Sequence, residues 1–97
     1  MKKIIWENQA IEHFKKSIKY IRKDSPQNAE KIKNAIFDKI DELMIHPDAH
    51  PADKYKLNNN GNYRAFEIYT FRIGYLIKDG EIIIARIRST KQEPLDY

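Results

Sequence analysis

Hydrophobic residues recur at two spacings along the chain, and the change between them divides the sequence into a helical half and a strand half. After a short β-prone run from Ile4 to Trp6, apolar residues follow one another at intervals of three and four. This spacing places them on one face of a helix. The first stripe comprises Ile11, Phe14, Ile18 and Ile21, and the second comprises Ala29, Ile32, Ile36, Ile40, Leu43 and Met44.

Polar residues and prolines indicate where these two helices begin and end. Asn8 is suited to cap the first helix, and Ser25-Pro26 combines a capping serine with a proline at the first helical position. The second stripe ends at His46-Pro47. Because the two helices are joined so closely, we expect an antiparallel hairpin in which each helix buries one face.

Residues 47–62 have the composition of a loop, with two prolines and a run of asparagines and glycine from Asn58 to Asn62. After this loop the hydrophobic spacing changes to two, which is typical of strands. Asp79-Gly80 is suited to a tight hairpin turn. The predicted strands are Tyr63–Tyr69, Phe71–Ile77 and Ile82–Ser89, and an irregular tail runs from Thr90 to Tyr97.

These elements predict an α+β fold that forms a single domain over residues 1–97. It consists of a short N-terminal strand, an antiparallel helix hairpin and a three-stranded antiparallel meander. The chain shows no internal repeat and no domain boundary.

Alternation along the strands predicts where the charged side chains point. Phe71, Ile73, Tyr75 and Ile77 share one face of their strand, and Arg72 points the other way. In the last strand we assign Ile83, Ala85 and Ile87 to one face and Arg86 and Arg88 to the other. If the apolar faces pack on the helices, the three arginines converge on the free face of the sheet. Like charges that face each other weaken a sheet unless an anion or an acidic partner neutralises them.

Composition and charge narrow the class of protein. Hydrophobic residues make up 41% of the 97 residues, which favours a globular chain, and a net charge of +4 favours an acidic partner, either nucleic acid or protein. The absence of cysteine excludes disulfides and thiolate metal sites. The N-terminal apolar run stops at Glu7, too early for a secretion signal, and no later run is long enough to cross a membrane. We therefore expect a cytoplasmic protein.

The histidines do not form a pattern that is typical of metal binding. His46 and His50 are four residues apart, but Pro47 breaks the helix that would align them, and His13 has no ligand partner nearby. The chain also lacks a glycine-rich phosphate loop. We predict neither a metal nor a cofactor.

Several segments resemble the RelE/ParE toxin superfamily of type II toxin–antitoxin systems, which includes plasmid-stabilisation proteins. The resemblance rests on the helical region from Ala10 to Leu43, on Gly61-Asn62-Tyr63-Arg64, on Phe71-Arg72-Ile73-Gly74-Tyr75 and on the run from Ile82 to Arg88. It implies a growth-inhibiting toxin that a cognate antitoxin holds inactive. Some members cleave messenger RNA in the ribosome, and others inhibit DNA gyrase.

The resemblance also implies roles for particular residues if this chain cleaves RNA without a metal. Arg72 matches the arginine over the scissile phosphate, Lys54 and Lys56 are candidates for the base, and Tyr97 stands for a tyrosine that orients the substrate. The candidates for RNA binding are Arg64, Arg86, Arg88 and Lys91.

One feature departs from the family pattern. Many members carry a histidine after the last strand that acts as the general acid, whereas this chain has Arg88-Ser89-Thr90-Lys91. Because the lysine and arginine set is present, we favour a ribosome-dependent mRNA endoribonuclease. The alternatives are a gyrase inhibitor that acts by protein binding, and an inactive member that binds only its antitoxin.

Overall fold

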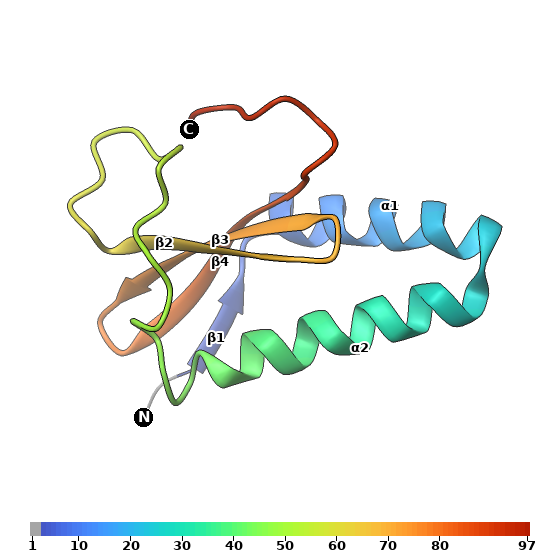
Figure 1. Ribbon diagram of the computed structural model, residues 1–97. Coiled ribbons are helices and arrows are strands. Elements are labelled where there is room, and N and C mark those ends of the chain that lie inside the picture. The colour runs from blue at the N-terminus through green and yellow to red at the C-terminus, as the bar shows by residue number, and fades with distance from the viewer. Residues whose placement is uncertain (1–2) are drawn as a thin grey trace.

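The chain forms one strand, two helices and three further strands in a computed structural model that describes residues 3–97 (Figure 1). The predicted α+β fold, with its helix hairpin and three-stranded meander, is therefore confirmed. Met1 and Lys2, at the start of the N-terminal run, lie outside the described residues. The elements are β1 (Lys3–Trp6), α1 (Asn8–Asp24), α2 (Pro26–Glu42), β2 (Tyr63–Ile68), β3 (Phe71–Lys78) and β4 (Glu81–Ser89).

Ser25 ends α1 and begins α2, as the sequence predicted. Its side-chain Oγ accepts a hydrogen bond of 3.1 Å from the backbone N–H of Asn28, which satisfies one of the free donors at the start of α2. The predicted cap of α1 is wrong by one residue, because Glu7 occupies the N-cap position and Asn8 is already helical. α2 ends at Glu42, earlier than predicted. The residues beyond it form turns closed by short-range backbone hydrogen bonds, such as that from Leu43 N to Ile40 O.

The four strands form one sheet in the order β1-β4-β3-β2. β1 pairs with β4 in parallel, whereas the other neighbours are antiparallel. At the turn between β3 and β4, Asp79 and Gly80 adopt φ values of 50° and 75°. These left-handed conformations suit a two-residue hairpin, and Lys78 pairs with Glu81 on either side of it.

The hydrophobic core lies between the helix hairpin and one face of the sheet, which we call the core face. Trp6 at the end of β1 extends this core by packing on Phe14 with ring centroids 5.5 Å apart. The predicted face of β3 is confirmed, since its apolar residues are buried or pack against the core. The buried core residues are Ala10, Phe14, Ile18, Ala29, Ile32, Ile36, Ile40, Leu43, Phe66, Phe71, Ile73, Tyr75, Ile82, Ile84 and Ile87.

A β-bulge in β4 corrects the predicted face of that strand. Gly74 pairs with Arg86 and Tyr75 pairs with Ile84, so Ala85 is an extra residue without a partner on β3. Such a residue resets the alternation of side chains. Ile82 and Ile84 therefore face the core, with exposed fractions of 1% and 0%, instead of the predicted Ile83 and Ala85.

The predicted direction of Arg86 and Arg88 is unaffected by the bulge. Ile87 lies beyond it and is buried in the core, so Arg86 and Arg88 on either side of Ile87 point away from the helices. Within residues 3–97, no helix combines the length and the apolar character needed to cross a membrane.

Candidate functional site

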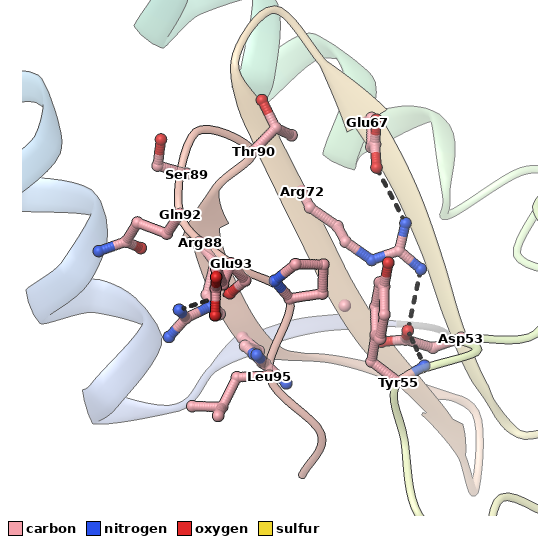
Figure 2. Close-up of a pocket in the computed structure, with 13 residues that line it drawn as sticks. Asp53, Tyr55, Glu67, Arg72, Arg88, Ser89, Thr90, Gln92, Glu93 and Leu95 are labelled. Carbon is pink, nitrogen blue, oxygen red and sulfur yellow. Dashed lines mark hydrogen bonds and ion pairs between the residues drawn. The ribbon is translucent and has the colours of Figure 1, made fainter.

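Three arginines on neighbouring strands meet on the sheet face opposite the core face. We call this surface, defined by Arg72, Arg86 and Arg88, the arginine face. Arg72 lies directly across the ladder from Arg88, and Arg86 lies across from Gly74. All three line a cavity of about 230 Å³, which opens between the sheet and the segment after β4 (Figure 2). The predicted convergence of the arginines is confirmed.

The charge of Arg72 is neutralised within the chain. Its Nη2 atom lies 2.9 Å from Oδ1 of Asp53, and its Nη1 atom lies 3.1 Å from Oε2 of Glu67 (Figure 2). The guanidinium also stacks 4.8 Å from the ring centroid of Tyr55. The sequence predicted that an anion or an acidic partner would neutralise the arginines, and for Arg72 two carboxylates of the protein itself do so.

Asp53 reaches the arginine face because its segment runs along the edge of β2. Ala52 forms an isolated bridge with Arg64, and the backbone N–H of Asp53 donates to the carbonyl of Tyr63. The side-chain amide of Asn59 closes the loop by donating to the carbonyls of Tyr63 and Asp53. Residues predicted as a plain loop thus hold a carboxylate that is only 3% exposed.

Asp53 is charged at neutral pH although it is buried. Burial alone would raise the pKa of its carboxyl group, but the Tyr97 hydroxyl, the Arg72 guanidinium and the backbone N–H of Tyr55 all stabilise the anion, and the pKa is lowered. The Tyr97 hydroxyl donates to Oδ2 at 2.7 Å. Burial and this carboxylate raise the pKa of Tyr97, so the phenol stays protonated.

Tyr97 is anchored, and the segment after β4 therefore returns across the sheet (Figure 1). Its backbone N–H donates to the carbonyl of Tyr55 at 2.9 Å, and its carbonyl accepts from Leu57 N at 2.7 Å. Gly74 leaves room for the phenol, because a Cβ there would lie 2.5 Å from Oη of Tyr97. A glycine within a strand often marks such a close approach. The segment lacks regular structure, as predicted.

Three of the four predicted catalytic residues line one or other of two cavities that have Arg86 and Arg88 in common. Arg72 lines the first, whereas Lys56 lines a second cavity of about 210 Å³ together with Tyr97. The Lys56 ammonium donates to the carbonyl of Leu57 and lies 4.7 Å and 5.5 Å from the ring centroids of Tyr63 and Tyr97. Lys54 is exposed, with Nζ 5.2 Å from the ring centroid of Tyr55. Arg72 and Tyr97 are linked through Asp53, because each binds one oxygen of its carboxylate. The catalytic role of the four residues stays a prediction.

The predicted RNA-binding residues are also separated. Arg64 pairs with Tyr75, which is buried on the core face, and its Nη1 atom donates to the carbonyls of His50 and Asp48 at 2.6 Å and 3.2 Å. Arg64 thus fixes the loop before β2 and does not reach the arginine face. Lys91 is exposed in the turn after β4. The RNA-binding role of these residues stays a prediction.

Asp53 and Glu67 are the site residues that the sequence prediction missed. Glu67 had a usable signal, because it lies on β2 directly across from Arg72. Asp53 had none, because its position depends on the path of an irregular segment. Among residues 3–97, the structure contains no group of three or more histidine, cysteine, aspartate or glutamate side chains placed to hold a metal ion.

Comparisons with known proteins agree with this fold. The family model of the ParE toxin of the type II toxin–antitoxin system parDE matches residues 4–94. A solved chain from a chromosomal ParDE toxin–antitoxin system of P. aeruginosa superposes with a TM-score of 0.71 and 19% sequence identity, covering 92% of this chain and 96% of that chain. At this identity the likeness supports the fold alone. No curated protein matches the sequence significantly.

Proposed function

The chain belongs to the ParE toxin family of type II toxin–antitoxin systems, and on this premise we propose that it arrests growth by binding DNA gyrase through protein contacts. Gyrase inhibition is the usual activity of ParE toxins. It requires a binding surface and no proton transfer. We further propose that a cognate antitoxin holds the toxin inactive, and the similarity to a chain from a ParDE toxin–antitoxin system supports this.

We favour gyrase inhibition over RNA cleavage because Arg72 is already bound by carboxylates of the protein itself. A nuclease of the kind considered would use Arg72 to stabilise the charge on the scissile phosphate. The guanidinium instead binds Asp53 and Glu67, and the low pKa of Asp53 keeps a negative charge at that point. An incoming phosphate would therefore meet like charge. Two further candidates, Lys56 and Tyr97, are engaged in contacts of their own.

RNA cleavage, which the sequence alone favoured, stays the alternative function. It is favoured by Arg86 and Arg88, which both line the first cavity and form no ion pair among residues 3–97. These two side chains are available to phosphate groups. The alternative lacks the histidine that acts as the general acid in many members, because no histidine follows β4.

The test measures supercoiling of relaxed plasmid by purified DNA gyrase as the purified toxin is added. We expect supercoiling to fall with toxin concentration, while a topoisomerase of another class in a parallel reaction keeps its activity. Messenger-RNA ends are mapped in cells that express the toxin, with translation running and then blocked.

The outcomes separate the three hypotheses. Growth arrest with inhibited gyrase and intact transcripts supports the proposal. Translation-dependent cuts with unimpaired gyrase would replace the proposal with the nuclease. Folded protein that affects neither gyrase, transcripts nor growth would identify an inactive member that binds only its antitoxin.

A further inference from the structure

Two of the five arginines in the sequence differ from the others in their surroundings. Arg22 and Arg72 bind carboxylates, and Arg64 donates to two backbone carbonyls at 2.6 Å and 3.2 Å. Arg86 and Arg88 form no ion pair with any carboxylate among residues 3–97. Because buried or half-buried charges are normally paired in proteins, these two guanidiniums call for an anion that the chain does not supply.

The lack of an anionic partner is clearest at Arg86. Its guanidinium stacks on the ring of Tyr97 at 4.3 Å, and its Nη1 atom is buried without a hydrogen-bond partner. Burial and the nearby positive charge of Arg88 lower the pKa of Arg86. Arg88 makes one long hydrogen bond, of 3.4 Å, to the carbonyl of Glu93.

Both arginines are accessible from two sides of the segment that returns across the sheet. Arg86 and Arg88 line the first cavity, of about 230 Å³, and also the second, of about 210 Å³. Each space is large enough for a side chain but small for a folded domain. A planar guanidinium binds a carboxylate through two parallel hydrogen bonds, which are shorter and stronger than neutral ones.

Carboxylates line both cavities beside the two arginines. Glu67 and Glu93 line the first cavity, and Glu7 and Asp96 line the second. A nucleic acid carries regularly spaced phosphates, so binding one of them at the arginines would bring its neighbours toward these carboxylates. A single acidic side chain on a protein segment avoids this repulsion.

We propose that Arg86 and Arg88 form a recognition site for a carboxylate on an acidic segment of a protein partner. The proposal rests on the proposed function, in which the toxin acts and is controlled through protein contacts. The acidic side chain would enter beside the Tyr97 ring and provide the buried Nη1 atom of Arg86 with its missing acceptor.

The test compares two ligands at constant ionic strength: a capped peptide that contains a single glutamate, and a short single-stranded RNA. Binding is followed by the NMR shifts of the arginine Nε–Hε groups. We expect saturable binding of the peptide, with the largest shift at Arg86. Arg86→Gln and Arg88→Gln should each weaken it by about ten-fold or more, the size of one charged hydrogen bond.

The matched control is Arg22→Gln, which removes the same charge from an exposed pair with Glu30 and should leave peptide binding unchanged. If Arg86→Gln disturbs the fold, Arg88→Gln and the wild-type Arg86 shift still decide the question. Equal losses in all three variants would show nonspecific attraction and overturn the proposal. Tighter binding of the RNA would overturn it in favour of a nucleic-acid ligand.

This experiment contains no gyrase, so its failure is separate from failure of the proposed function. Gyrase inhibition with no specific peptide binding would reject the carboxylate site alone. Specific peptide binding without gyrase inhibition would reject the proposed function and leave the site in place.

Discussion

The two faces of the sheet are built on different principles although they share the same strands. The core face is apolar and buried against both helices, so many small contacts contribute to its stability. The arginine face depends on a few polar contacts, above all those of Asp53 and Tyr97, which come from segments far apart in the sequence. Loss of a single polar contact should therefore have little effect on the core face. On the arginine face, a substitution that removes or adds a single atom should disturb the packing.

The largest expected effect is on the core face, where the bulge determines which isoleucine is buried. Ile84→Ala should lower the free energy of unfolding by about 2–5 kcal/mol, because it leaves a cavity in a core that cannot fully collapse. Ile83→Ala is the matched control, since the same atoms are removed from a half-buried side chain on the other face. Urea denaturation measures both, and an equal or larger loss for Ile83→Ala would contradict the assigned faces.

Gly74→Ala should lower the free energy of unfolding by about 1–3 kcal/mol, as expected when an atom is forced into a filled space. The new Cβ would meet the Tyr97 hydroxyl at 2.5 Å and Oδ2 of Asp53 at 3.0 Å. The measurement is a double-mutant cycle with Tyr97→Phe, which removes the closest atom. In that background Gly74→Ala should cost less, and strict additivity of the two changes would show that the hydroxyl does not set the spacing.

Asp53→Asn should destabilise the protein by about 1–2 kcal/mol, because Arg72 and Tyr97 lose a charged partner. Glu67→Gln removes the other carboxylate from Arg72, but its side chain is 55% exposed, and the loss should stay below about 1 kcal/mol. Thermal and urea unfolding of the two variants check this order. Equal effects would mean that burial of Asp53 adds nothing to its contact with Arg72.

The contribution of Asp53 to the free energy of unfolding should decrease gradually as the pH is lowered. Folding lowers the pKa of its carboxyl group below the ordinary value of 3.8. The ionised carboxylate therefore stabilises the fold above pH 3.8, and this contribution is lost as the pH falls through the lower folded value. The difference in unfolding free energy between the wild type and Asp53→Asn should therefore be constant near neutral pH and shrink in acid. A difference that grew in acid would contradict the lowered pKa.

The elements that could be predicted from the sequence are those that local pattern determines. The stripes of α1 and α2, the Ser25 cap and the Asp79-Gly80 turn each depend on residues close together in the chain, and all are confirmed. The convergence of Arg72, Arg86 and Arg88 also followed from alternation within strands.

The missed features depend on long-range geometry. The position of Asp53 requires the path of the loop along β2, and the anchoring of Tyr97 requires both that loop and the space above Gly74. The bulge could not be read from the run Ile82-Ile83-Ile84, because three identical residues fit either face. The surroundings of the predicted site residues depend on these features, which no local pattern in the sequence contains.

The extra residue in β4 affects how site residues can be transferred between members of the family. A relative without the equivalent of Ala85 would present its two arginines on the same face, but one position closer to the hairpin turn. An ungapped alignment from that turn would then match Arg86 of this chain with an inward-facing apolar residue. Alignments of this strand should therefore place a gap at Ala85 and take Ile87 as their reference, since its buried position lies beyond the bulge.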